Sequence, residues 1–442
     1  MSKSIKTAVS RTRFNRLALE GGWIILGQVI TILGSLALVR VLTERLNPEQ
    51  YGQLALGLTV AGLVNQTITG GLSVGIGRFY SIAAGVNDLA SYMRSSQSLL
   101  KNGTAVIATL GLCLIIGLLG LGYSQWIGLA LAALVLSIFS GYNTALNNIQ
   151  NAARQRAVVS LHAGADAWLK VGLVVVVMLW LGTSSTVVVI GYACSSFFIT
   201  MSQFLFLRQT IQPTLSLTPN ILEWKKQIWK YSLPFCTFGV FTWMQQVSDR
   251  WALQIYSTEA EVGQYAVLFH LGYTPIALVT GLLTSFIAPI LYHRSGDASD
   301  HSRNENVHQL SWRMTQLLIV ITLLAVLLAF ALHKWVFNLL VAPAYYSISY
   351  LLPWVVLAGG LFAAGQMLSL KFMSEMKSSK LTLIKITTAL IGVLCNLVGA
   401  AFMGMQGVVI GLVVCSAIYL LWMAVVAQNN KSTKSLSTFN PP

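Results

Sequence analysis

The chain has 442 residues, of which 55% are hydrophobic and only 9% are charged. Soluble domains carry roughly 25% charged residues, so this composition excludes an ordinary soluble fold. Lys and Arg outnumber Asp and Glu by 28 to 13. This excess gathers in alternate loops, as the positive-inside rule requires, so it indicates no nucleic-acid partner. We predict an all-α polytopic membrane protein.

About twelve transmembrane helices are predicted, because one span needs about 20 mainly apolar residues. The N-terminal apolar stretch is too long for a signal-peptide core and forms the first span. Charge-free segments of double length must fold back at residues 120–125, 182–185 and 404–407. In chain order, the predicted spans are residues 20–42, 52–77, 101–121, 126–148, 158–181, 186–206, 231–255, 263–288, 314–334, 350–370, 382–403 and 407–427.

The basic residues predict the orientation of the chain. An even number of spans places both termini on one side of the membrane. Of the 28 Lys and Arg residues, only Arg40, Arg45, Arg250 and Lys334 belong to the opposite side. Cytoplasmic loops carry the basic excess, so both termini are expected in the cytoplasm. The predicted location is the cytoplasmic (inner) membrane.

A polar segment near mid-chain, residues 207–230, divides the spans six from six and contains Pro213 and Pro219. It predicts an N-terminal six-helix bundle (1–206), a cytoplasmic linker (207–230), a C-terminal six-helix bundle (231–427) and a cytoplasmic tail (428–442). The residues that open the second span, Gly52-Gln53-Leu54-Ala55, resemble Gly263-Gln264-Tyr265-Ala266, which open the eighth. Two halves with even span numbers predict a parallel internal repeat, a frequent transporter architecture.

Ionisable groups inside a span cost about 2.5–3.5 kcal/mol at mid-helix and therefore mark functional candidates. In the fifth span, His162, Asp166 and Lys170 follow one another at intervals of four residues and share one helix face. Two interpretations stay open. The Asp166–Lys170 pair either locks helix packing, or it lines a polar cavity in which Asp166 or His162 binds a coupling H⁺ or Na⁺.

Asp249 and Arg250 interrupt the seventh span near its outer end. Adjacent residues of a helix point about 100° apart, so each needs a partner elsewhere, and none is apparent locally. Arg40 and Arg78 lie at the ends of the first two spans, where snorkelling to the interface is the alternative to a function. The planar guanidinium fork suits phosphate, which makes Arg40, Arg78, Arg250 and the embedded Lys170 candidate anion ligands.

Polar and small side chains inside the spans have structural and functional interpretations. Amides such as Asn65, Asn143 and Asn147 either join helices or bind sugar hydroxyls. Glycines at 117, 120, 359, 360 and 365 are predicted helix contacts. The His residues are scattered, and the five Cys residues show no CxxC spacing. No enzymatic activity, metal site or cofactor is therefore predicted, apart from a coupling ion.

Four motifs resemble the polysaccharide-transporter family, within the superfamily that joins multidrug exporters and lipid-linked oligosaccharide flippases. The resemblance covers residues 14–427, and the Asp-Arg and Glu-Val-Gly-x-Tyr combination is its most specific part. The motifs are Asn47-Pro48-Glu49-Gln50-Tyr51-Gly52, Gly77-Arg78-Phe79-Tyr80, Asp249-Arg250 with Glu261-Val262-Gly263-Gln264-Tyr265-Ala266, and Ala344-Tyr345-Tyr346.

This resemblance implies two six-helix bundles in a V around a central hydrophilic cavity. It also implies flipping of an undecaprenyl-pyrophosphate-linked oligosaccharide to the outer leaflet by alternating access, for O-antigen or exopolysaccharide assembly. Arg78, Asp249 and Arg250 match family motif positions, with Asp249 as the foremost coupling candidate. Arg40, Lys170, Asp166 and His162 come from this sequence alone. The segment 224–226, Trp-Lys-Lys, has no recognised family counterpart.

Two alternative functions stay open. A cation-coupled multidrug exporter of the same superfamily needs embedded acidic groups, whereas the embedded residues here are rich in Arg. A glycan polymerase or glycosyltransferase usually needs a large outer loop with catalytic groups, but residues 335–349 contain no carboxylate. The expected partners are the lipid-linked oligosaccharide and membrane lipids, with a polysaccharide polymerase and glycosyltransferases as further candidates.

Overall fold

The computed structural model describes residues 3–210, 221–295, 301–374 and 378–435, which contain helices and no strand. Pro213 and Pro219 of the predicted linker, and residues 436–442 of the predicted tail, lie outside the described residues. In chain order, the elements are α1 (Lys3–Arg45), α2 (Pro48–Val64), the π-helical η1 (Asn65–Thr69), α3 (Gly70–Gly85), α4 (Leu89–Gly120), η2 (Ser124–Trp126), α5 (Ile127–Ala152), α6 (Arg156–Leu181), α7 (Ser185–Thr210), α8 (Ile221–Tyr256), α9 (Glu259–Ser295), α10 (His301–Leu340), η3 (Pro343–Leu351), α11 (Leu352–Ser374) and α12 (Ser378–Ser435).

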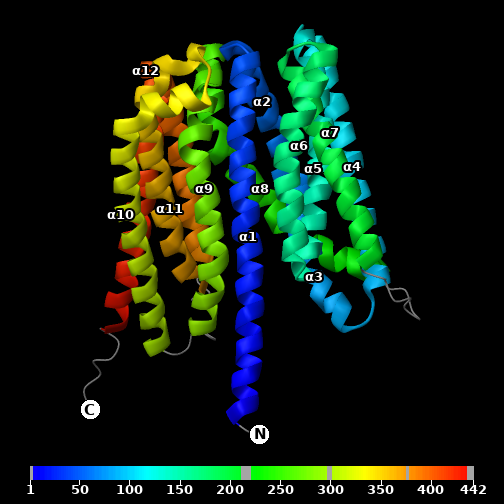
Figure 1. Ribbon diagram of the computed structural model, residues 1–442, viewed down its shortest axis with the longest axis vertical. Coiled ribbons are helices and arrows are strands. Elements are labelled where there is room, and N and C mark those ends of the chain that lie inside the picture. Colours follow the sequence, from blue (N-terminus) through cyan, green and yellow to red (C-terminus); the bar gives the residue numbers. More distant parts are fainter. Residues whose placement is uncertain (1–2, 211–220, 296–300, 375–377, 436–442) are drawn as a thin grey trace. The chain divides into compact units, whose positions relative to one another are not determined.

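The predicted all-α membrane fold is confirmed. Nine helical stretches of the described residues are long and apolar enough to cross a membrane. One of them, Leu383–Gln428, contains the two spans predicted at residues 382–403 and 407–427. The second predicted span consists of α2, η1 and α3, and the seventh lies in α8. Within each unit the long helices run side by side, as α5, α6 and α7 do in one and α9, α10 and α11 do in the other (Figure 1).

Glycines end the helices at predicted turns. Gly182 follows α6 with φ +84°, and Gly404 interrupts α12 with φ +56°, a backbone region that L side chains rarely adopt. The interruption at Gly404 separates two arms that then pack closely. A Cβ on Gly399 would collide with the backbone carbonyl of Gly407, and the reverse also holds. The predicted reversal at residues 404–407 is therefore confirmed.

The chain forms two compact units that exchange short segments. Unit 1 comprises Met1–Val41 and Leu54–Trp243, and unit 2 comprises Leu42–Gln53 and Met244–Pro442. The connector between the first two helices thus belongs to unit 2, and the first half of α8 belongs to unit 1. The predicted domain boundaries at residues 206, 230 and 427 stay predictions, because a contact unit does not define an independently folding domain.

The first half of α8 packs against α3 through positions where only glycine fits. A Cβ on Gly71 would collide with Cys236, and one on Gly75 would collide with Ser232. Further along the helix, Trp243 Nε1 donates a 2.7 Å hydrogen bond to the carbonyl oxygen of Thr59. These contacts attach α8 to unit 1 along more than half of its length, which explains why it does not group with the C-terminal spans alone.

The two copies of the Gly-Gln repeat meet in unit 2. A Cβ on Gly52 would collide with the carbonyl of Glu259, and a Cβ on Gly263 would collide with that of Pro48. These contacts are reciprocal: residues 48 and 52 become 259 and 263 when the repeat shift of 211 (263 minus 52) is added. Reciprocal contacts are the mark of a two-fold axis, so they support the internal repeat. Gln53 Nε2 adds a 2.9 Å hydrogen bond to Glu259 Oε2.

Three of the five glycines predicted to contact another helix do so, and two do not. A Cβ on Gly360 would meet the side chain of Thr322, and one on Gly365 would meet the ring of Tyr419. Gly359 likewise lies against α9. Gly117 and Gly120 have nothing within 4 Å of the corresponding position, so the predicted contact is wrong there. Those two glycines end α4 on an exposed face, where sequence spacing alone cannot tell a helix contact from a lipid-facing position.

We expect Gly399→Ala to destabilise the protein and Gly117→Ala to leave it unchanged or slightly more stable. The new methyl at 399 must displace the backbone of the other α12 arm, at a cost of roughly 1–3 kcal/mol. The methyl at 117 meets open space and gains helix propensity of up to about 1 kcal/mol. Thermal unfolding of the two purified variants in one detergent measures the difference. Equal midpoints would contradict the close packing of the arms.

Candidate functional site

The polar face predicted on the fifth span lies against α7 in unit 1. His162 Nε2 is 3.1 Å from Ser202 Oγ, and Ser195 Oγ donates a 2.8 Å hydrogen bond to Asp166 Oδ1. Lys170 Nζ donates to Asp166 Oδ2 at 2.5 Å. The three candidates therefore share one face, as predicted, and two of them bond directly to α7.

Both carboxylate oxygens of Asp166 are occupied. Its pair with Lys170 is partly accessible, with 27% of the Lys170 side chain and 19% of the Asp166 side chain exposed. The ammonium of Lys170 also lies 5.8 Å from the centre of the Tyr192 ring, within cation–π range. A coupling cation at Asp166, or an anion at Lys170, would have to displace the partner already present. This geometry favours the helix-locking interpretation of the pair.

The amides inside unit 1 bond mainly to one another. Asn65 Nδ2, in the π-helical turn, donates to Ser140 Oγ at 2.7 Å. Gln203 Nε2 donates to Asn147 Oδ1 at 2.8 Å, and Asn147 Nδ2 donates to Asn143 Oδ1 at 3.1 Å. These bonds join α2–η1 to α5 and α5 to α7. The amides therefore serve at least as helix contacts, which was one of the two interpretations from the sequence.

A second cluster lies at the predicted outer end of α8, in unit 2. Tyr265 Oη donates a 2.7 Å hydrogen bond to Asp249 Oδ2, and Asp249 is only 3% exposed. Arg250 Nη1 donates to the carbonyl oxygen of Gln246 at 3.1 Å and lies 3.8 Å from Asp249 Oδ1. Its guanidinium carbon is 4.8 Å from the centre of the Phe269 ring. Both members of the Asp-Arg motif are thus held against α9.

This cluster corrects one expectation and confirms another. The absence of a local partner for Asp249 was wrong, because the backbone N–H of the adjacent Arg250 donates to Oδ1 at 2.7 Å. The expectation that each residue finds a partner elsewhere was right, because α9 supplies Tyr265 for Asp249 and Phe269 for Arg250. The adjacent Arg250 still approaches Asp249, because its long side chain bends back along the helix, although 3.8 Å is too long for a strong bond.

Other residues of the resemblance motifs also hold the same end of unit 2 together. Glu261 Oε2 accepts the backbone N–H of Met405 at 3.2 Å, directly after the break at Gly404. A carboxylate at a helix N-terminus is favoured by the helix dipole and by the free N–H groups there. Tyr345 Oη donates to the carbonyl oxygen of Leu46 at 3.2 Å. The motifs that indicated the family thus have structural tasks in this unit.

Arg40 and Arg78 lie in unit 1 and differ in environment. Arg40 is half-buried in α1 and has a partner. Arg78 is exposed in α3, and no hydrogen bond or ion pair joins it to any described residue. Of the predicted anion ligands, Arg78 is therefore the one whose guanidinium is free. The predicted approach of Arg40, Arg78 and Arg250 across a shared cavity involves both units and stays a prediction.

Two buried polar anchors were missed in the sequence. Lys371 is 3% exposed in α11, and its Nζ donates to the carbonyl oxygen of Ala427 at 3.0 Å. It lies one residue beyond the span predicted at residues 350–370, where the sequence gives no sign of burial. Trp224, noted only as a departure from the family, donates from Nε1 to Asp88 Oδ2 at 2.8 Å. Each contact joins residues far apart in the chain, so no local sequence pattern predicts it.

No cluster of three or more His, Cys, Asp or Glu side chains suited to a metal is present among the residues that the structure describes. The polar groups reported above instead form closed pairs and short chains within each unit. Chemically, such an arrangement can bind ions and hydrogen-bonding ligands.

Comparisons with known proteins identify the fold. No protein-family model matches the sequence, and no curated protein matches it either. Among solved structures, the chain is similar to a multidrug resistance MATE family transporter of the MOP superfamily in its inward-facing conformation, with 17% identity and a TM-score of 0.63. That match covers 92% of this chain and 96% of the other.

Two further structures agree. The MATE transporter VcmN of Vibrio cholerae matches with 16% identity and a TM-score of 0.63, over 94% of this chain and 98% of that one. The lipid II flippase MurJ, in an inward closed conformation, matches with 12% identity and a TM-score of 0.65, over 96% and 94%. At these identities the likeness establishes the fold.

We expect Tyr265→Phe to destabilise unit 2, because it removes the hydroxyl that bonds to a buried carboxylate. A hydrogen bond to a charged group contributes about 1.5–3 kcal/mol. Tyr256→Phe is the matched control, since Tyr256 is 54% exposed at the end of α8, the helix that carries Asp249. Thermal unfolding in detergent measures both. A loss no larger for Tyr265→Phe than for the control would show that the bond to Asp249 contributes nothing.

With its near-complete coverage in all three matches, this chain has the fold shared by MATE transporters and the lipid II flippase MurJ.

Proposed function

We propose that the protein is a flippase that moves an undecaprenyl-pyrophosphate-linked oligosaccharide across the cytoplasmic membrane, for O-antigen or exopolysaccharide assembly. Its termini would be cytoplasmic, and it would transport its substrate without changing it chemically. The observation that carries the proposal is the state of the embedded charges. The carboxylates well inside the spans already have partners, while Arg78, at the end of the second span, has none among the described residues.

Asp166 and Asp249 are the two carboxylates well inside the predicted spans. Asp166 is paired with Lys170, and Asp249 is bonded by Tyr265 and lies beside Arg250. A carboxylate that is already compensated offers little to an organic cation, because the new interaction must replace an existing one. This argues against a multidrug exporter that depends on embedded acidic groups, although the fold is shared with MATE transporters.

Arg78 supports an anionic substrate instead. Its guanidinium is exposed and has no partner among the residues that the structure describes. A guanidinium binds phosphate oxygens through two parallel N–H groups, which suits a pyrophosphate. The lipid II flippase MurJ has the same fold, so the fold is compatible with a flippase function. Arg40, Arg250 and Lys170 are further proposed pyrophosphate ligands.

Energy coupling is proposed to involve H⁺ or Na⁺, with Asp249 as the foremost candidate and Asp166 and His162 as the others. Asp249 is buried, and among the described residues it is compensated by a hydroxyl, a backbone N–H and a distant guanidinium. Its charge is therefore less completely neutralised than that of Asp166, which holds an ammonium at hydrogen-bond distance. Binding of a proton at Asp249 would weaken the attraction of Arg250 for this position.

We expect Asp249→Asn to uncouple transport from the ion gradient while leaving the hydrogen bond with Tyr265 available. Flipping by the variant in proteoliposomes should be slower and should no longer respond to an imposed pH or Na⁺ gradient. Tyr265→Phe serves as the control for loss of structure, since it keeps the carboxylate. Gradient-dependent transport at the wild-type rate by Asp249→Asn would exclude this residue as the coupling site.

We expect Arg78→Gln to slow flipping roughly 10- to 100-fold, because a charge-assisted hydrogen bond contributes about 1.5–3 kcal/mol. Arg78→Lys should retain part of the rate through its charge. Arg94→Gln is the matched control, because Arg94 is likewise exposed in unit 1, on α4. The measurement is the transfer of undecaprenyl-pyrophosphate-linked oligosaccharide between leaflets in proteoliposomes of equal protein content.

The same vesicles decide between the two transport functions. Leaflet transfer of the oligosaccharide by the wild type, with no uptake of cationic dyes, establishes the flippase. Dye uptake driven by an ion gradient, with no leaflet transfer, would overturn it in favour of the exporter. Wild-type rates in Arg78→Gln would remove Arg78 from the pyrophosphate site.

A further inference from the structure

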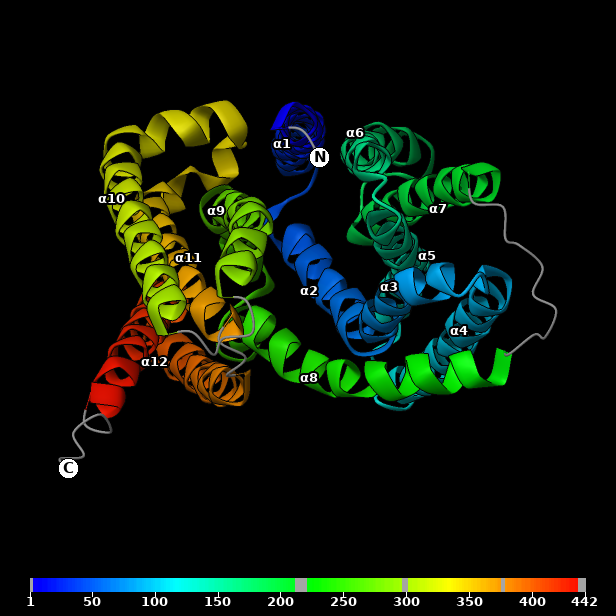
Figure 2. The same ribbon diagram turned by 90° about the horizontal axis from the view of Figure 1, so that it is seen from below.

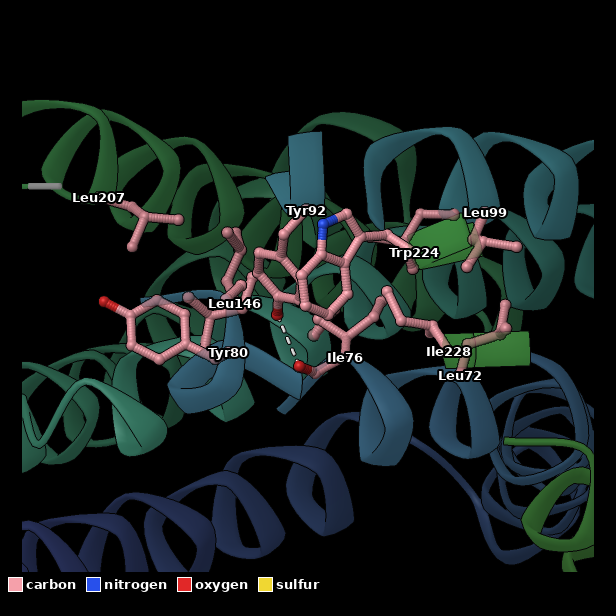
Figure 3. Packing of buried hydrophobic residues seen from close by; sticks show 13 residues of the cluster. Leu72, Ile76, Tyr80, Tyr92, Leu99, Leu146, Leu207, Trp224 and Ile228 are labelled. Atoms are coloured by element: carbon pink, nitrogen blue, oxygen red, sulfur yellow. Dashed lines mark hydrogen bonds between the residues drawn. The ribbon is translucent and has the colours of Figure 1, made fainter. Parts of the chain in front are cut away.

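The first half of α8 presents one face to unit 1 and the opposite face outward. Its inward face carries Trp224 and Ile228, which belong to the buried cluster drawn in Figure 3. Trp224 lies beside Tyr92, with ring centres 6.2 Å apart, and donates from Nε1 to Asp88. Ser95 Oγ donates to the carbonyl oxygen of Ile221 at 2.8 Å. The start of the helix is therefore fixed in rotation as well as in position.

The outward face combines lysines with apolar and aromatic side chains. Its residues follow at helical spacing and are all exposed, with Leu222 at 81% and Trp229 at 47%. This spacing places them on one stripe opposite Trp224 and Ile228. We call this stripe the α8 outer face, and its members are Leu222, Lys226, Trp229, Lys230 and Leu233.

The lysines of this face lack a counter-charge. No ion pair joins Lys226, Lys230 or the neighbouring Lys225 to any part of the chain that the structure describes. The nearest acidic residue on the helix, Glu223, instead accepts a 3.0 Å hydrogen bond from Gln227. The preceding segment, residues 211–220, contains no acidic residue. Three lysines against the single carboxylate of Glu223 leave a net positive charge on the first turns of α8.

The position of the helix in unit 1 suits the membrane interface. Trp224 contacts residues beside the connection between α3 and α4, on the predicted cytoplasmic side. Seen from below, α1 of the same unit is viewed along its axis, whereas the first half of α8 runs sideways past α3 and α4 (Figure 2). The first half of α8 is thus strongly inclined to α1, so one of its faces can follow the plane of the lipid headgroups for several turns.

We propose that the α8 outer face is a binding site for anionic phospholipid headgroups of the cytoplasmic leaflet. Lys226 and Lys230 would bind the phosphate groups, while Trp229, Leu222 and Leu233 enter the boundary between headgroups and acyl chains. Basic residues with aromatic and aliphatic neighbours on one helix face are typical of interfacial binding. Each lysine near an anionic surface is expected to strengthen binding about fivefold.

Native mass spectrometry of the full-length protein with dioleoyl-phosphatidylglycerol or dioleoyl-phosphatidylcholine, titrated in mixed micelles, tests this site. The wild type should retain the anionic lipid preferentially. The double variant Lys226→Gln/Lys230→Gln should bind it about 25-fold more weakly, from two lysines at about fivefold each. The double variant Lys101→Gln/Lys334→Gln removes two exposed lysines elsewhere and should bind like the wild type.

Rescue and competition separate charge from fold and one phosphate source from another. Lys226→Arg/Lys230→Arg should restore binding, and all variants should share the wild-type unfolding midpoint in phosphatidylcholine micelles. Inorganic pyrophosphate at the same concentration should not displace the lipid. Unchanged phosphatidylglycerol affinity in the glutamine variant, equal affinity for the two lipids, or displacement by pyrophosphate would each overturn the proposal. None of these measurements depends on flipping activity.

Discussion

A hydrocarbon interior provides no water to solvate a charged side chain, so every embedded charge must find its partner within the protein. This constraint organises both units. In unit 1, Lys170 and Ser195 satisfy Asp166, and in unit 2, Tyr265 and Arg250 lie against Asp249. Each arrangement joins neighbouring helices, so the cost of placing a charge in the membrane also fixes the packing of the spans.

Close approach of backbones is the second organising feature. The reciprocal contacts of Gly52 and Gly263 and those of Gly399 and Gly407 bring helices nearer than any side chain permits. Without water to drive apolar association, such tight packing is a main source of attraction between membrane helices. The residues that resemble a family motif, Gly263 and Tyr265 among them, thus have direct structural roles. A motif can therefore identify a fold without marking where the substrate binds.

The sequence predicted the parts of this fold that depend on local pattern. Long apolar runs located the spans, glycines at residues 182 and 404 located reversals, and the spacing of His162, Asp166 and Lys170 gave their shared face. It could not predict contacts between distant segments, such as Tyr265 with Asp249 or Trp224 with Asp88. The sequence also predicted helix contacts at Gly117 and Gly120 that do not form, because a small residue has the same sequence signature whether it faces a helix or lipid.

The exchange of segments between the units has a consequence for biosynthesis. Gly71 and Gly75 in α3 pack against α8, whose docking half begins at residue 221, after an intervening stretch of four helices. During synthesis from the N-terminus, this surface of α3 is therefore inserted long before the helix that covers it. Six spans emerge as an incomplete bundle with an open side, and only the arrival of α8 closes it. Assembly of the first unit must thus wait for the start of the second half of the chain.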